Sequence, residues 1–227
     1  LGATARAMLN FKLSKLRLVS PCFDINNEKI LPLSAGATKV LKGIKNFKSF
    51  EESIKDFNIL IATTNRMRSI KKKQINFKNL NKKIKNSANK VGIVFGPEKS
   101  GLDNNHISMC DFALRIDSNP NFSSLNLSHA VSLVAYEIMK GTKMTENKIH
   151  KNVNSDKEIV YAPKTELLNF FSILEYHLEE TNFFLVKERK KVIVQKIRSI
   201  FNRLEPTSND ISTLLGIIKS LRKNNQK

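Results

Sequence analysis

Two short apolar runs near the middle of the chain, residues 91–95 and 112–116, each lead directly into a loop rich in Gly, Pro, Ser and Asn. Apolar runs of this length, bounded by turn-forming residues, are typical of buried β-strands. Loops at the carboxyl ends of parallel strands are where α/β proteins hold their ligands. The chain is therefore predicted to fold around a parallel sheet, with a ligand site where these strands end.

The rest of the first 140 residues continues this alternation of strand and helix patterns. Strands are also predicted at 16–19 and 58–62, and helices at 3–14, 34–41, 49–57 and 125–139. Ser123 and Ser124 are the predicted N-cap of the last helix. The basic stretch that follows residue 66 predicts a loop with a helical turn. Strands that alternate with helices imply a parallel sheet covered by helices, so an α/β domain is expected over residues 1–141.

The pattern changes after this domain. Residues 142–160 lose the periodicity and are rich in Lys and Asn, which predicts a linker. Apolar residues at helical spacing then predict three amphipathic helices, at 164–179, 187–204 and 209–221. These helices would form a small module over residues 161–227. Their apolar stripes are interpreted as core, and their Lys and Arg residues suit contact with phosphate.

The charge of the chain points to a polyanionic partner, because the formal net charge is +19 and the sequence pI is about 10.0. A general bias toward Lys and Asn would also raise the charge, but the distribution argues against bias alone. No acidic residue occurs between Asp56 and Glu98. That stretch favours nucleic acid over a merely solvated face, and its lack of a broad apolar face disfavours a membrane surface. Its cationic residues are Arg66, Arg68, Lys71, Lys72, Lys73, Lys78, Lys82, Lys83, Lys85 and Lys90.

Several classes of site are not supported by the residues. The sequence has neither a Gly-x-Gly-x-x-Gly motif after a strand nor a Gly-Lys-Ser/Thr phosphate loop. Its four histidines are scattered without Cys or acidic partners at ligand spacing, so no metal site is predicted. Cys22 and Cys110 fit neither a disulfide framework nor a zinc site, and a reducing cytoplasm is expected. No apolar run approaches the length of a membrane span, so no membrane partner is expected.

Three loops that follow strands remain as the candidate site: residues 63–66, 96–101 and 116–126. Glycines let the main chain approach a ligand closely, and free backbone N–H and C=O groups can read an adenine edge. This favours a nucleoside-type ligand. The same Gly-Pro and Asn-Pro pairs are equally consistent with plain turns, so the residues alone leave both interpretations open.

Three segments, in order, resemble the three motifs of the TrmH/SpoU family of RNA 2′-O-ribose methyltransferases, which belongs to the SPOUT class. The first is Gly2-Ala3-Thr4-Ala5-Arg6-Ala7-Met8, the second is Phe95-Gly96-Pro97-Glu98-Lys99-Ser100-Gly101-Leu102, and the third is Ser123-Ser124-Leu125-Asn126-Leu127. The resemblance covers residues 1–140. The family usually has a strand and an Asn before the first Gly, so we expect that strand to be missing here.

The resemblance implies an α/β fold whose parallel sheet carries a C-terminal trefoil knot, a homodimer, and S-adenosylmethionine as the methyl donor. By matched position, the donor would be lined by Thr63, Thr64, Asn65, Gly96, Ile116, Ser123, Ser124 and Leu125. The catalytic residues would be Arg6, Ser124 and Asn126, with Glu98 bracing the loop. Because a guanidinium stays protonated, the expected role of the arginine is to hold a phosphate and stabilise developing alkoxide charge. The donor is already an activated electrophile, so no metal is expected.

Within the family, the chain is most similar to the tRNA cytidine-32/uridine-32 2′-O-methyltransferases. The similarity lies in residues 16–21, in the loop at 63–68 and in the helical C-terminal extension. We therefore expect methylation of nucleotide 32 in the anticodon loop of tRNA. The expected RNA contacts are Arg66, Arg68, Lys71, Lys72 and Lys73. The alternatives are a related enzyme acting on another tRNA position or on rRNA, and a non-catalytic RNA-binding protein that keeps the knotted scaffold.

Overall fold

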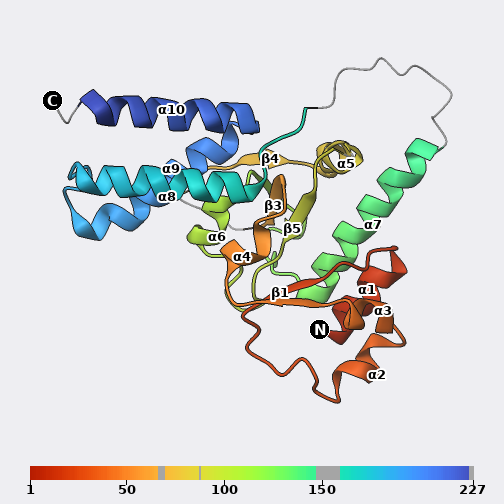
Figure 1. Ribbon diagram of the computed structural model, residues 1–227. Helices are drawn as coiled ribbons and strands as arrows, with labels where there is room; N and C mark the ends of the chain where they lie inside the picture. The colour runs from red at the N-terminus through yellow and green to blue at the C-terminus, as the bar shows by residue number, and fades with distance from the viewer. Residues whose placement is uncertain (66–69, 87, 147–158, 225–227) are drawn as a thin grey trace.

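The computed structural model describes residues 1–65, 70–86, 88–146 and 159–224 (Figure 1). Its centre is a four-stranded sheet in the order β4-β6-β3-β5, and every neighbouring pair in it is parallel. The strands are β3 (Ile59–Thr63), β4 (Lys73–Ile75), β5 (Val91–Val94) and β6 (Phe112–Leu114). A second, two-stranded parallel sheet joins β1 (Arg17–Val19) to β2 (Lys45–Phe47). The mixed α/β class with parallel sheets is thus confirmed.

The central strand β3 is buried on both faces, and its alternating side chains build two separate cores. Leu60 and Ala62 face a cluster formed with α4 (Phe50–Ile54) and α6 (Asn104–Met109). Ile59 and Ile61 face the other cluster, formed with α5 (Phe77–Lys85) and α7 (Leu127–Glu146). A parallel sheet has this arrangement because its crossover connections place helices on both faces. The only polar surfaces left to the sheet are then its edges and its two ends.

The amino-terminal helices cover the lower part of α7, as Figure 1 shows. Helix α1 (Gly2–Asn10) contacts α7, α2 (Ile30–Ser34) and α3 (Thr38–Lys42). Helices α1 and α2 come close at Gly2, where an added Cβ would lie 2.4 Å from the Ile30 carbonyl oxygen. The apolar cluster below α1 contains Ala5 and Met8, and it also contains Phe95 and Leu127. Helix α1 is therefore packed beside the two chain segments that flank the expected site.

The C-terminal helices are α8 (Lys164–Glu180), α9 (Lys187–Arg203) and α10 (Ser208–Asn224). Phe170, Phe171 and Ile211 form the core between α8 and α10. Helix α9 contacts α6, and α8 contacts α4, so the three helices lie on the sheet face opposite α7 (Figure 1). No helix in the described part of the chain is long and apolar enough to span a membrane.

The basic stretch predicted as a loop instead contains β4 and α5. Strand β4 is at the edge of the sheet and only Ile75 in it is buried, so its polar composition conceals a strand. Helix α5 buries Leu80, and Asn76 caps it by accepting a hydrogen bond from the Asn79 N–H at 2.9 Å. Three of its lysines, Lys82, Lys83 and Lys85, lie in the last turn, where they complement the helix dipole. The predicted helical turn is thus a nine-residue helix, and the edge strand before it was not predicted.

Two further predictions differ from the structure. The helix expected at 34–41 is two short helices, α2 and α3, because Ala35 and Gly36 take positive φ values of 44° and 85°. Helix α6 was not predicted. Helix α7 continues to Glu146, which lies within the segment predicted as a linker, and residues 147–158 of that segment lie outside the described residues.

Candidate functional site

The loops that follow β3 and β6 are joined by one side chain. Asn65, just beyond β3, donates through Nδ2 to Ser118 Oγ at 3.0 Å and to the Ser123 carbonyl at 2.8 Å. Ser118 also donates to the Ser123 carbonyl, at 3.3 Å. The loop at 115–126 is therefore folded over the end of β3. Ser118 was not singled out from the sequence, where nothing distinguishes it from other loop serines.

The end of β3 is also fixed to both of its neighbours. The hydroxyl of Thr63 donates to the Val94 carbonyl of β5 at 2.9 Å, and the Thr64 N–H donates to the Leu114 carbonyl of β6 at 3.1 Å. The three strand ends consequently form one rigid edge. The structure thus brings together the three loops that were predicted from the sequence to form the site.

The loop after β5 meets the start of α7 through Glu98. Its Oε1 accepts a hydrogen bond from Asn126 Nδ2 at 2.7 Å and from the Leu127 N–H at 3.4 Å. Asn126 Oδ1 in turn accepts from the N–H and the hydroxyl of Ser128, at 3.0 and 2.7 Å. Asn126 is therefore the N-cap of α7, and the carboxylate lies at the positive end of the helix dipole.

This arrangement corrects the prediction that Ser123 and Ser124 cap the helix. The carbonyl of Ser123 is used by Asn65, and α7 begins at Leu127, too far along the chain for either serine to be its N-cap. Ser124 is exposed, whereas Ser123, Leu125 and Ile116 are half-buried. In this structure Asn126 contacts Glu98, and its catalytic role stays a prediction.

The second loop depends on two glycines. Gly101 has a φ of +66°, and its N–H donates to the Pro97 carbonyl at 2.7 Å. Gly96 lies against the backbone at the other end of the loop, because an added Cβ would lie 2.2 Å from the Leu102 nitrogen. The loop therefore closes tightly on itself, with room for backbone only.

One polar atom in the site is buried and unsatisfied. Asn65 Oδ1 has no hydrogen-bond partner among the described residues, although Nδ2 of the same amide makes two hydrogen bonds. Buried acceptors without a partner are rare and costly in native proteins. The atom suits a ligand that brings an N–H or O–H donor, such as an exocyclic amino group or a ribose hydroxyl.

Arg6 is exposed on α1, next to the buried Ala5. The cluster that holds Ala5 contains Phe95, directly before Gly96, and Leu127, directly after Asn126. The structure therefore places the helix that bears Arg6 beside the second and third loops.

The five residues expected to contact RNA lie in different environments or outside the described residues. Arg66 and Arg68 lie outside the described residues. Lys71 is exposed, and Lys73 lies with its Nζ 3.5 Å from Glu205 Oε1. Lys72 is buried and donates to the Ser108 carbonyl at 2.9 Å, which corrects its assignment to the RNA surface. Desolvation by burial lowers the pKa of Lys72 to about 8.

The described residues contain no group of three or more His, Cys, Asp or Glu side chains that could hold a metal ion. The polar groups of the site are instead backbone atoms, amides, hydroxyls and the carboxylate of Glu98. Such groups can bind and orient a polar organic ligand at the carboxyl end of a parallel sheet.

Comparison with known proteins divides the chain into two matched parts. Residues 1–136 match the SpoU rRNA Methylase family, and residues 165–227 match the C-terminal domain of the tRNA methyltransferase TrmJ. An uncharacterized tRNA/rRNA methyltransferase of Haemophilus influenzae is 32% identical over 98% of this chain and 89% of its own length. The tRNA (cytidine/uridine-2′-O-)-methyltransferase TrmJ of Photorhabdus laumondii is 30% identical over 98% of this chain and 91% of its own.

Solved structures give the same relationship. The crystal structure of TrmJ from Z. mobilis ZM4 superimposes with a TM-score of 0.86 at 33% identity, covering 97% of this chain and 92% of that one. Because this likeness extends over nearly the whole of both chains, it includes the C-terminal helices as well as the parallel sheet.

The cap on α7 gives a first prediction. Asn126→Ala removes both the cap and the hydrogen bond to Glu98, so the free energy of unfolding should fall by about 1–2 kcal/mol in urea titrations. Asn126→Asp keeps the capping oxygen but sets a second carboxylate beside Glu98, and should lie between alanine and wild type. Asn121→Ala, an exposed change in the same loop, is the matched control. Equal stability of Asn126→Ala and the control would refute the cap assignment.

Proposed function

The chain belongs to the SpoU rRNA methylase family, and from this membership we propose that it methylates the 2′-hydroxyl of a ribose in tRNA. The observation that carries the proposal is the set of three loops joined through Asn65 and Glu98 at the carboxyl end of the sheet. The named tRNA 2′-O-methyltransferases among its relatives support tRNA as the substrate.

The proposed methyl donor is S-adenosylmethionine, which supplies a methyl group already activated by a sulfonium sulfur. The site fits such a group because the buried Asn65 Oδ1 needs a hydrogen-bond donor, which an amino or hydroxyl group of the methyl donor would supply. We assign the lining of the site to Thr63, Thr64, Asn65, Gly96, Ile116, Ser123, Ser124 and Leu125. In this assignment Thr63 presents main chain, because its hydroxyl donates to the Val94 carbonyl. The main-chain N–H of Thr64 is already bonded to the Leu114 carbonyl.

The remaining task of the chain is to align a ribose hydroxyl with the methyl group and to exclude other geometries. Alignment of this kind accounts for much of the rate of a two-substrate reaction. Arg6 is proposed to hold the phosphate beside the target ribose and to stabilise negative charge on the 2′-oxygen as its proton leaves. The exposed Ser124 and Asn126 are proposed to lie next to the ribose, and Glu98 holds Asn126 in place through its hydrogen bond.

The finer features of the proposal rest on the sequence resemblance. We propose nucleotide 32 of the anticodon loop as the target, a homodimer as the active form, and a trefoil knot formed by the loop at 115–126. Support for the knot comes from that loop being bonded to Asn65 on one side and, through Asn126, to Glu98 on the other. We further propose residues 1–141 as the methyltransferase domain, 142–160 as a linker and 161–227 as a helical domain.

The proposal is tested by incubating the protein with unmodified tRNA and isotopically labelled S-adenosylmethionine, then mapping ribose methylation by its resistance to alkaline cleavage. Methylation at nucleotide 32 is the expected result. Methylation elsewhere, or in rRNA alone, would refute the position or the substrate. Calorimetry with S-adenosylmethionine separates the remaining case, since a non-catalytic RNA-binding protein need not bind it.

Arg6→Ala should nearly abolish methyl transfer while leaving the affinity for S-adenosylmethionine within a few-fold of wild type, because the arginine is proposed to contact RNA. Removal of one charge-stabilising group typically costs about 10²–10³ in kcat. Single-turnover methylation and calorimetry measure the two quantities. A variant with wild-type turnover would show that Arg6 has no catalytic role.

Lys71 and Lys72 form a natural pair for testing the RNA surface, because Lys71 is exposed and Lys72 is buried. Lys71→Gln should lower the slope of log affinity for tRNA against log salt by roughly 0.7–0.9, the change expected for one lost phosphate contact. Lys72→Gln should leave that slope unchanged and reduce stability instead. Binding titrations over a series of salt concentrations distinguish the two, and the opposite ranking would return Lys72 to the interface.

A further inference from the structure

A second buried polar cluster lies at the amino end of the sheet, away from the candidate site. Asp111 directly precedes β6, and Lys164 is the first residue of α8. The Lys164 Nζ lies 2.6 Å from Asp111 Oδ1, and the two side chains are only 3% and 4% exposed. The other oxygen of Asp111 accepts a hydrogen bond from the Leu60 N–H of β3 at 2.7 Å. One carboxylate therefore connects helix α8 to two strands of the central sheet.

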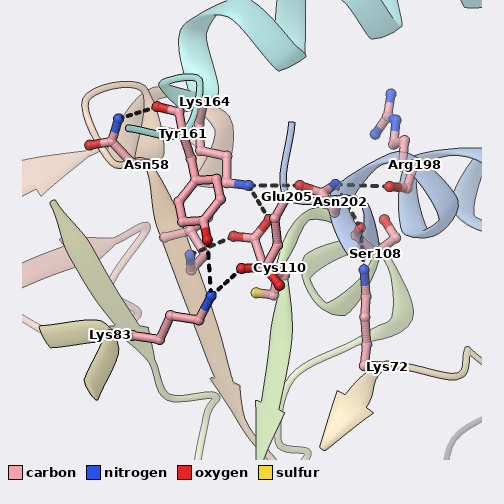
Figure 2. A network of polar contacts seen from close by, with 12 residues as sticks. Asn58, Lys72, Lys83, Ser108, Cys110, Tyr161, Lys164, Arg198, Asn202 and Glu205 are labelled. Atoms are coloured by element: carbon pink, nitrogen blue, oxygen red, sulfur yellow. Dashed lines mark hydrogen bonds and ion pairs between the residues drawn. The ribbon is translucent and has the colours of Figure 1, made fainter. Parts of the chain in front are cut away.

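Helix α9 joins the same cluster through Asn202, as Figure 2 shows. The Lys164 Nζ donates to Asn202 Oδ1 at 2.7 Å, and Asn202 Nδ2 donates to the Ser108 carbonyl of α6 at 3.2 Å. The Ser108 carbonyl also accepts from the buried Lys72 (Figure 2). Residues from α6, α8, α9 and the sheet thus share one dry network, which we call the docking network (Asp111, Lys164, Asn202, Ser108 and Lys72).

Main-chain hydrogen bonds fix the start of α8 around this network. The Lys164 N–H donates to the Phe57 carbonyl at 2.7 Å, and the Thr165 N–H donates to the Lys55 carbonyl at 3.0 Å. At the outer edge, Glu205 pairs with Lys83 of α5 and with Lys73 of β4. The C-terminal helices are therefore attached to the sheet at several separate points.

A buried ion pair is weak evidence for stability, because desolvation of both charges offsets most of their attraction. Its hydrogen bonds are satisfied in one geometry only, whereas an apolar contact can slide. The docking network is thus suited to fixing an orientation. Fixed by it, α9 exposes three cationic side chains that share one face because they recur every seven residues: Arg189, Lys196 and Arg203, the cationic face of α9.

We propose that Lys164, with Asp111 and Asn202, is a positioning residue for tRNA. The docking network holds the cationic face of α9 in one orientation relative to the loops after β3, β5 and β6, so that one tRNA contacts both. This inference rests on the proposed function. The network acts at Leu60, near the start of β3, and at Asp111, just before β6, whereas the donor loops follow Thr63 and Leu114. Loosening it should therefore affect tRNA and spare the donor.

The test compares Lys164→Met with Lys190→Met, a matched control. Lys190 pairs with Glu179 between α8 and α9 and takes no part in the docking network. Lys164→Met should raise the KM for unmodified tRNA by about tenfold, because a loosely tethered second surface loses effective concentration. The affinity for S-adenosylmethionine in calorimetry should stay within twofold. Lys190→Met, which removes the same charge, should change the KM by no more than about twofold.

Two further variants guard against misfolding. Lys164→Met/Asp111→Asn removes both members of the buried ion pair and keeps an oxygen for the Leu60 N–H, so it should fold while still lacking the ion pair. Asn202→Ala removes only the link to α9. Both should raise the KM for tRNA in the same direction as Lys164→Met. A parallel loss of S-adenosylmethionine affinity in these folded variants would overturn the proposal, since it would indicate a general loss of structure.

Orientation is read directly from the distance between two spin labels. Cys22 is exposed and Cys110 is buried, so Gly216→Cys, placed where an added Cβ meets nothing within 4 Å, supplies the second label on α10. The Gly216→Cys protein, labelled at Cys22 and at position 216, should give one narrow distance distribution. Adding Lys164→Met to it should give a broad one. An unchanged distribution or an unchanged KM would overturn the proposal. A parent chain that binds no tRNA would refute the proposed function, and the label distances would still report separately on the docking network.

Discussion

A parallel sheet with helices on both faces leaves polar groups only its edges and its two ends, and this constraint organises the molecule. The carboxyl end gathers the loops after β3, β5 and β6, joined by Asn65 and by Glu98. The amino end receives Asp111 and, through it, the C-terminal helices. The sheet thus separates the proposed methyl-transfer site from the attachment of the C-terminal helices, while connecting them through the same strands.

The central strands and the converging loops were predictable because they depend on local pattern. Strand β3 is apolar and bounded by polar residues, and its observed span, Ile59–Thr63, is shifted by one residue from the prediction. Strand β4 was missed, and helix α5 was predicted only as a helical turn. Each buries a single residue, Ile75 or Leu80, so the sequence shows little apolar pattern there. Lys72 was wrongly assigned to the RNA surface because the sequence shows only its charge. The packing of the folded chain decides which lysines of a basic stretch are buried.

Contacts between residues far apart in the chain could not be predicted from the sequence. Lys164 and Asp111 are 53 residues apart, and each resembles an ordinary charged residue until the fold buries both. The motif residues were recognised from the sequence, and Glu98 was expected to brace its loop. The partner of Glu98 was not predictable, because Asn126, the N-cap of α7, is 28 residues away in the chain.

The ion pairs of Glu205 also bear on how the charge of this protein is to be understood. Lys73 and Lys83 belong to a stretch without acidic residues, yet a carboxylate from the far end of the chain lies against both. Folding thereby places a negative charge beside the basic stretch, and the order of residues in the sequence does not show this. A polyanion that approaches this face therefore meets a weaker positive electrostatic field than the formal charge of the stretch implies. It is attracted most strongly to the cationic side chains that remain exposed to solvent.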